Sequence, residues 1–186
     1  KPDLICGVSV GALNAVALGS GITPEILASL WTKYRHRNIF RFTLPYFFGN
    51  LLSGKGPASL VAPGPLAELI RENISFESLK NSRTEVIITA VNIKTSQIAY
   101  FNNSAIEEEH LMASAAMPLM CSWRTIDGEP YWDGGIMDNV PILPALKSGA
   151  EEIVVVLLSA VNAFEQKAPC TIRDASEMVF EQSLTG

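Results

Sequence analysis

The sequence predicts an α/β fold with a mostly parallel central sheet and helices on both of its faces, a three-layer arrangement. Predicted strands alternate along the chain with predicted helices, which is the pattern of parallel α/β proteins. Residues 152–159 are almost entirely apolar, as expected for a strand buried on both faces of such a sheet. Hydrophobic residues make up 48% of the 186 positions and charged residues 18%, so we expect one domain with a sizeable core.

The N-terminal part of the chain predicts a strand, a tight turn and two helices. A short apolar strand at 3–6 ends at Gly7, and the small apolar residues at 10–18 favour a buried helix. Thr23 is a good cap for a second helix, which has Pro24 at its first position and extends to about residue 37. The apolar residues of this helix recur at core spacing: Ile26, Leu27, Leu30, Trp31 and Tyr34.

Residues 38–63 predict a long irregular segment in which aromatic side chains alternate with prolines and glycines. Segments of this kind are often lids or binding loops. The aromatic residues are Phe40, Phe42, Tyr46, Phe47 and Phe48. Because basic residues flank them, they suit contact with a lipid surface that has anionic head groups. Packing beneath the loop or lining an acyl pocket remains an alternative.

The remainder of the chain continues the alternation of strands and helices. Residues 85–91 and 97–101 predict strands joined by a turn. Asp127-Gly128, between two short strands at 124–126 and 130–132, is a strong hairpin signal. Helices are expected at 65–73, 106–116, 141–149 and 174–184.

Composition and charge exclude several classes of function. The formal net charge of −5 argues against broad nucleic-acid binding. The three cysteines have no CxxC spacing, so neither a disulfide framework nor a zinc site is expected, and a reducing, cytoplasmic location is favoured. No apolar run reaches the roughly 18 residues of a membrane span. No metal-ligand spacing and no phosphate-binding loop is evident, so we expect no metal and no cofactor.

Gly7-Val8-Ser9-Val10-Gly11 is the first candidate for chemistry. Between a strand and a helix, a sharp turn would hold the Ser9 hydroxyl out from the fold, and small residues at positions 7 and 11 would let strand and helix approach. The N–H of Val10 would then point at a developing oxyanion, helped by the positive end of the helix. The alternative is that Ser9 is a polar residue in a glycine-rich turn.

A nucleophilic serine needs a base, and the sequence offers few. The only histidines are His36, among basic residues, and His110, in an acidic helix start, and neither has a partner pattern. Of the five aspartates, Asp133 follows two aromatic residues and precedes Gly134-Gly135, so it can lie at a strand end and reach Ser9. The alternative is a turn aspartate that binds its own backbone.

These motifs together resemble the patatin-like phospholipases, a family of serine lipid acyl hydrolases. The serine turn, the aspartate followed by two glycines, and Ala113-Ser114-Ala115-Ala116-Met117-Pro118 all match segments of that family. The resemblance covers nearly the whole chain. It implies that Ser9 is the nucleophile and Asp133 its only side-chain partner, in a dyad that forms an acyl-serine and then hydrolyses it. We expect partial desolvation to raise the pKa of Asp133, because an ordinary aspartate is a poor base at neutral pH.

The resemblance also implies something outside this sequence. Patatin-like proteins have a glycine-rich loop, after their first strand, whose N–H groups form the oxyanion hole. We therefore expect residues 1–186 to be a single catalytic domain that lacks this strand and loop. The predicted activity is phospholipase A or lysophospholipase-like hydrolysis of a lipid or acyl ester, with peripheral membrane contact. An acyltransferase using the same dyad, and a catalytically impaired lipid-binding domain, remain the alternatives.

Overall fold

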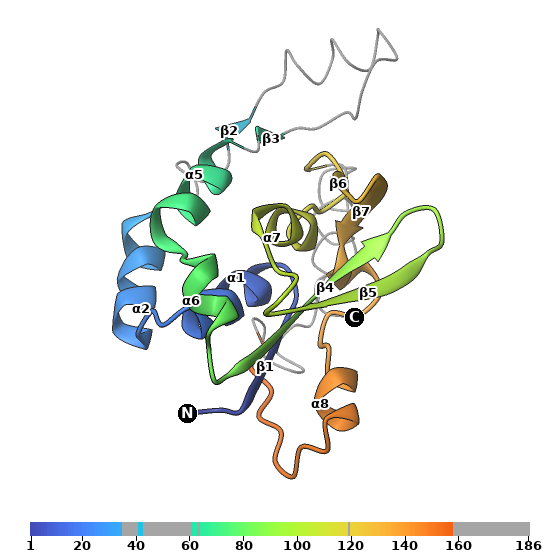
Figure 1. Cartoon of the computed structure of the whole chain (residues 1–186). Coiled ribbons are helices and arrows are strands. Elements are labelled where there is room, and N and C mark those ends of the chain that lie inside the picture. Colours follow the sequence, from blue (N-terminus) through green and yellow to red (C-terminus); the bar gives the residue numbers. More distant parts are fainter. Residues whose placement is uncertain (35–40, 43–60, 63, 119, 158–186) are drawn as a thin grey trace, which may run out of the picture.

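The structure is a computed structural model, and it describes residues 1–34, 41–42, 61–62, 64–118 and 120–157 (Figure 1). Among these residues, strands and helices form one α/β unit, which confirms the predicted fold class. The main sheet contains β1 (Leu4–Gly7), β4 (Glu85–Asn92), β5 (Gln97–Asn102), β6 (Arg124–Ile126) and β7 (Glu129–Asp133). Two short strands, β2 (Arg41–Phe42) and β3 (Val61–Ala62), form a separate antiparallel pair.

Strand β4 is the centre of the main sheet and has three partners. β5 pairs with it from Ile87 to Asn92, so β1 and β7 must share its opposite edge. β1 runs parallel to β4 beside residues 85–88, and β7 runs antiparallel to it beside residues 90–92. The two strands therefore approach each other end to end, and both leave the sheet at the level of Thr89. This junction brings the turn after β1 next to the last residue of β7.

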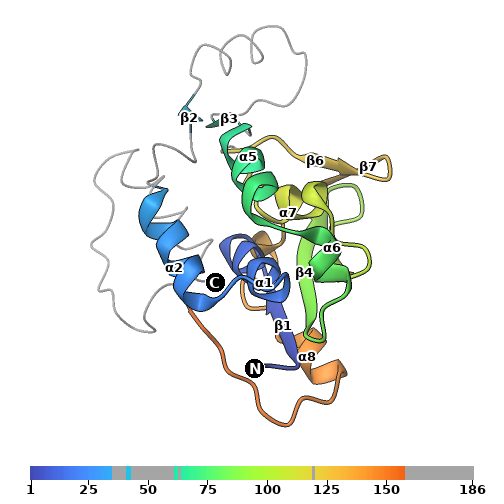
Figure 2. The ribbon, with the colours of Figure 1, turned by 60° about the vertical axis from the view of Figure 1, so that its left-hand side comes forward.

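Helices cover both faces of the sheet, as predicted. On one face lie α1 (Val10–Gly19), α5 (Gly64–Asn73), α6 (Phe76–Lys80) and α7 (Glu108–Ser114) (Figures 1 and 2). Their apolar side chains form the main core with Val86 and Ile88 of β4, and Ile5 of β1 packs against it. The next residue, Cys6, points to the other face, where its thiol contacts the backbone of Ala145 in α8 (Leu143–Lys147).

Two turns have the backbone that their sequences predict. Asp127 and Gly128 have φ angles of 51° and 80°, the left-handed values that a two-residue type I′ hairpin requires, and they join β6 to β7. The four residues after Asn92 connect β4 to β5, with Asn92 facing Gln97. Both predicted hairpins are therefore confirmed.

The prediction of a mostly parallel sheet is wrong for the residues that the structure describes. Only β1 and β4 pair in parallel, whereas the other three pairings of the main sheet are antiparallel. The reason is that β4–β5 and β6–β7 are hairpins and that the segment with α7, between β5 and β6, returns the chain so that β7 runs antiparallel to β4.

The predicted strand at 152–159 is also absent from residues 152–157, and 158–159 lie outside the described part of the chain. Val154 is 78% exposed and Val156 87% exposed, the opposite of a buried central strand. No described strand lies on the outer edge of β1, where the sheet ends.

The second predicted helix forms, but not as a core helix. α2 (Pro24–Lys33) is capped by Thr23, whose hydroxyl accepts the N–H of Ile26. It ends at Lys33, before the predicted boundary, and none of its residues is buried; Ile26, for example, is 51% exposed.

Helix α6, which Ser75 caps, has no counterpart among the predicted helices.

The predicted helix at 174–184 lies outside the described residues. In the part of the chain that is described, no helix has the length and apolar character needed to cross a membrane.

Candidate active site

The turn after β1 holds Ser9 in an unusual backbone conformation. Its φ of 53° and ψ of −122° lie in a region that a residue with a side chain adopts at a cost of about 1–3 kcal/mol. Ser9 is the N-cap residue of α1, yet its hydroxyl makes no capping hydrogen bond to that helix. An N-cap serine ordinarily accepts an N–H of the first turn. The hydroxyl of Ser9 is therefore free to interact elsewhere.

The two glycines around Ser9 differ in their roles. A Cβ on Gly7 would collide with the carbonyl oxygen of Gly11 and would lie 2.8 Å from the nitrogen of Ala12, so strand and helix can approach this closely only without a side chain there. A Cβ on Gly11 would meet nothing within 4 Å. The expectation that Gly11 is also a steric requirement is thus wrong in this structure.

Val10 is the first residue of α1, so its N–H has no acceptor within the helix. Together with the positive end of the helix, it provides a donor for negative charge beside Ser9.

Asp133 ends β7 and is completely buried, with 0% of its surface exposed. Its Oδ1 accepts the N–H of Gly135 at 2.8 Å, so the turn interpretation of this aspartate is correct for one oxygen. The other oxygen, Oδ2, is buried without a well-aligned hydrogen-bond partner among the described residues. A buried acceptor in this state has a strong tendency to take up a proton.

The pKa of Asp133 reflects this position. Burial raises it above the ordinary 3.8, the Ser9 hydroxyl and the Gly135 N–H lower it, and the net pKa is about 6. The expectation that desolvation raises this pKa is borne out. The structure thus brings Ser9 and Asp133 within interacting distance.

Gly134 and Gly135 allow the chain to pass close to β4 and to the Ser9 turn. A Cβ on Gly134 would lie 2.5 Å from Oγ1 and 2.9 Å from the carbonyl oxygen of Thr89. A Cβ on Gly135 would lie 3.1 Å from Oδ1 of Asp133 and 3.8 Å from Cγ2 of Val8. The glycine pair therefore seats Asp133 at the junction where β1 and β7 meet.

A residue to which the sequence pattern assigned no role also contacts the Ser9 turn. The hydroxyl oxygen of Ser114, at the end of α7, accepts the N–H of Ser9 at 3.1 Å. Two residues further on, the carbonyl oxygen of Ala116 accepts the N–H of Asp133 at 3.0 Å. Residues 113–118 matched a family segment, but nothing in their pattern indicated these two contacts.

Other candidate residues lie away from this site or outside the described part. His36 is not described, and His110 uses Nδ1 to accept the N–H of Glu107, which completes a capping box at the start of α7. Phe42 lies in β2, whereas Phe40, Tyr46, Phe47 and Phe48 are outside the described residues. Among the described residues, no group of acidic, histidine or cysteine side chains could hold a metal ion.

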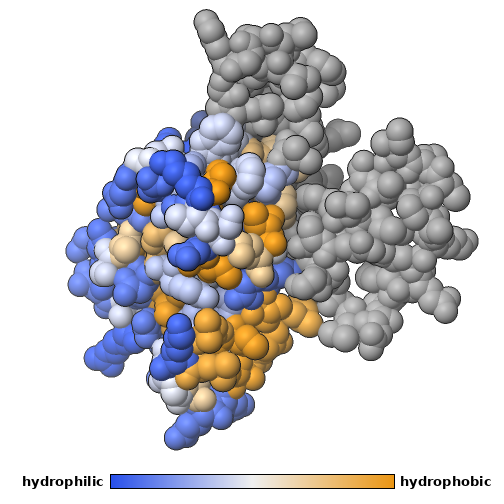
Figure 3. Space-filling model, turned by 90° about the vertical axis from the view of Figure 1, so that its right-hand side faces the viewer, coloured by the Kyte–Doolittle hydropathy of each residue, from blue (hydrophilic) through white to orange (hydrophobic). Residues whose placement is uncertain are grey.

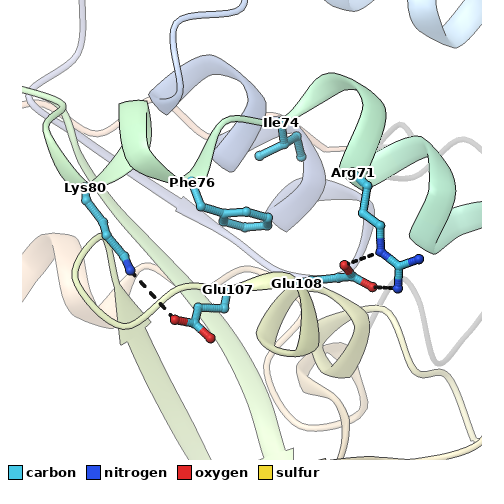
Figure 4. Close-up of a pocket in the computed structure, with 6 residues that line it drawn as sticks. All are labelled: Arg71, Ile74, Phe76, Lys80, Glu107 and Glu108. Atoms are coloured by element: carbon cyan, nitrogen blue, oxygen red, sulfur yellow. Dashed lines mark hydrogen bonds and ion pairs between the residues drawn. The ribbon is translucent and has the colours of Figure 1, made fainter.

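An open pocket between α5, α6 and the start of α7 has no reactive group (Figure 4). Phe76 and Ile74 lie between two ion pairs, in which Arg71 contacts Glu108 at 2.6 Å and Lys80 contacts Glu107 at 3.7 Å. Each cation is therefore already neutralised. The pocket is separate from Ser9 and Asp133, neither of which lines it.

Comparisons with known proteins agree with the geometry of this site. A family model described as patatin-like phospholipase matches residues 1–146. A mouse protein named 1-acylglycerol-3-phosphate O-acyltransferase Pnpla3 is 32% identical over 153 residues, which cover 75% of this chain and 32% of that protein. Two proteins named cGAMP-activated phospholipase are similar over 75% of this chain: one from Pseudomonas aeruginosa (27% identical, 44% of its length) and one from Vibrio cholerae (28%, 43%). The chain thus spans less than half the length of these relatives.

Proposed function

Because the chain belongs to the patatin-like phospholipase family, we propose that it is a serine lipid acyl hydrolase of the phospholipase A or lysophospholipase kind. Ser9 is the nucleophile and Asp133 the general base. The observation that carries this proposal is the pairing of a serine hydroxyl that does not cap its own helix with a fully buried carboxyl.

The reaction has two balanced half-steps. As Oγ of Ser9 bonds to the ester carbonyl carbon, its proton passes to Asp133, and the carbonyl oxygen becomes an oxyanion that accepts the N–H of Val10. The bond to the alcohol breaks, and the alcohol takes the proton from Asp133. Water then attacks the acyl-serine and gives its proton to Asp133. The bond to Oγ breaks, the free acid leaves, and the proton returns to Ser9.

One N–H at Val10 is a sparse oxyanion hole, and loss of a single donor typically costs about 10²–10³ in rate. We propose that a glycine-rich segment preceding residue 1 in the full-length protein supplies further donors, and that residues 1–186 form the rest of one catalytic domain. Two features support this: the outer edge of β1 has no described partner strand, and the apolar residues 153–157 are exposed. The relatives are also more than twice as long as their matched regions.

An acyltransferase is the second candidate, and the name of the mouse relative favours it. The acyl-serine would be captured by the hydroxyl of a glycerolipid in place of water. Analysis of products with and without a lysophospholipid acceptor separates the two, because a hydrolase releases free fatty acid in both cases.

Peripheral membrane contact through the aromatic residues at 40–48 is a further proposal. Replacement of Phe47 and Phe48 by serine should lower hydrolysis of phospholipid in vesicles several-fold more than hydrolysis of a soluble short-chain ester. Equal losses on both substrates would contradict a role at the membrane.

A fluorophosphonate probe tests the central proposal in the full-length protein. It should label the wild type and not Ser9→Ala, and Asp133→Asn should label at least 100-fold more slowly while remaining folded. Ser20→Ala, at the other end of α1, is the matched control and should label normally. Unchanged labelling of Ser9→Ala would refute the assignment, and an unlabelled wild type would favour a lipid-binding domain without catalysis.

A further inference from the structure

The segment after α7 contacts both halves of the dyad, although it is far from each of them in sequence. Ser114 accepts the N–H of Ser9, and Ala116 accepts the N–H of Asp133. We propose that Ser114 is a positioning residue that holds the nucleophile turn in its reactive geometry. This inference rests on the proposed function, and it adds a residue to which the reaction assigns no role.

The Ser9 N–H needs such an acceptor. The turn places Ser9 at a φ of 53°, outside both strand and helix geometry, so its N–H has no partner in β1 or α1. A backbone N–H that is buried without a partner is costly. The Ser114 hydroxyl removes this cost in the strained conformation, and thereby favours that conformation over relaxed alternatives.

The position of Ser114 suits this role. It is fully buried at 0% exposure, and it belongs to α7, whose Leu111 and Met112 are part of the main core. Its neighbours Ala113 and Ala116 are also buried, so the end of the helix has little freedom to move. The acceptor for Ser9 therefore lies on a rigid element.

The hydrogen bond from the Asp133 N–H to the Ala116 carbonyl oxygen fixes the proposed base relative to the same segment that binds Ser9. The two hydrogen bonds start two residues apart on one buried segment, so a shift of this segment would move nucleophile and base together. Without the Ser114 hydroxyl, the Ser9 turn can shift while Asp133 stays in place. Displacements of about 1 Å at a reacting group can cost 10²-fold in rate.

The test uses the full-length protein with Ser114→Ala and two controls. Ser20→Ala removes another side-chain hydrogen bond of a serine near α1, the one to the carbonyl of Ala17. Ile70→Val removes one methylene from a buried side chain of α5. It controls for a general loss of stability, because the change lies outside the Ser9–Asp133 pair. Three quantities are measured: the rate of fluorophosphonate labelling, kcat and KM on a soluble ester, and hydrogen exchange of the Ser9 amide by NMR.

We expect Ser114→Ala to slow labelling and kcat about 10- to 100-fold, with KM unchanged and faster exchange of the Ser9 amide. The midpoint of its pH–rate profile should not fall below the wild-type value, because Asp133 remains buried and a displaced Ser9 hydroxyl lowers its pKa less. Ser114→Thr, which retains the hydroxyl, should recover part of the rate.

Three results would overturn the inference: labelling of Ser114→Ala within twofold of wild type, a Ser9 amide that stays protected, or an equal loss of rate in Ile70→Val. The proposed function fails differently, since in that case the wild type itself is not labelled at Ser9. A wild type that reacts and a Ser114→Ala variant that reacts equally well reject only the positioning role.

Discussion

At the scale of single residues, the burial of Asp133 sets stability against chemistry. One carboxyl oxygen is satisfied by its own turn, through the N–H of Gly135, and the other is buried without a well-aligned partner. Burial makes the ionised form unfavourable and raises the pKa to about 6. The same burial makes Asp133 a stronger base than an exposed aspartate and still leaves it mostly ionised at pH 7.

The first prediction concerns activity and pH. In the proposed mechanism Asp133 is ionised when it accepts the Ser9 proton, so kcat/KM on a non-ionising ester should rise with pH and level off above a midpoint near 6. The measurement is a pH–rate profile between pH 4 and 8.5 with a check that the protein stays folded. A midpoint near 4, the value of an ordinary aspartate, would contradict the role of burial.

The second prediction concerns stability. The folded pKa of Asp133 lies above its unfolded value, so the folded protein binds the extra proton between about pH 4 and 6 and loses stability as pH rises through this window. Asp133→Asn removes the buried charge. It should be more stable than wild type at pH 7.5 by up to about 3 kcal/mol, from a shift of about two units at 1.36 kcal/mol each, and the difference should vanish below pH 4.

Urea unfolding at pH 3.8 and pH 7.5 measures this difference. Asp127→Asn is the matched control, because it makes the same change in a left-handed turn position that asparagine accepts well. A stability difference for Asp133→Asn that is equal at both pH values would show that the buried charge does not cause it.

At the scale of secondary-structure elements, α7 connects the scaffold to the site. At its start, Glu107, Glu108 and Glu109 each bind a cation of a different element: Lys80 of α6, Arg71 of α5 and Arg124 of β6. Exposed pairs of this kind contribute only about 0–1 kcal/mol each, so their effect is to orient the helix more than to stabilise the fold. At its other end, residues 114–116 contact the dyad.

The third prediction separates the two glycines of the serine turn. Gly7→Ala should destabilise the protein strongly and abolish labelling, because the added Cβ collides with backbone at the start of α1. Gly11→Ala should fold normally and gain up to about 1 kcal/mol, since Gly11 lies in a helix and its surroundings are open. Thermal unfolding of both variants is the measurement. Equal destabilisation by the two substitutions would contradict the assigned geometry.

The elements that the sequence predicts correctly are those with strong local signals. The strand, serine turn and helix at the N-terminus, the Asp127-Gly128 hairpin and the Thr23 cap each depend on neighbouring residues. Where the outcome depends on distant contacts, prediction from local pattern fails. The core spacing of α2 indicated burial that the described fold does not supply, and the hydrogen bond from Ser9 to Ser114 joins residues 105 positions apart. The position of Asp133 before two glycines indicated that it could reach Ser9, and the family resemblance implied the pair; the physical cause of their approach is the meeting of β1 and β7 at Thr89.

At the scale of the whole molecule, apolar surface is unevenly distributed. On the face shown in Figure 3, exposed apolar side chains gather in the lower part of the molecule, where Figure 1 places α8. Leu143 and Leu146 of that helix are 44% and 57% exposed, and residues 153–157 add a run of exposed apolar side chains. Surface of this kind on a stable protein usually marks a contact with something else.

The fourth prediction tests what covers residues 153–157. If a preceding segment adds a strand to the sheet in the full-length protein, the amides of these residues should exchange slowly there and rapidly in a chain of residues 1–186. Val154→Lys with Val156→Lys should then lower the Tm of the full-length protein by several degrees, because two buried side chains become charged. In the 1–186 chain the same change should leave Tm unaltered and reduce aggregation, since an exposed apolar segment favours association. Rapid exchange at 153–157 in both proteins would mean that this segment is not part of the sheet, and the exposure of these residues would no longer support a preceding strand.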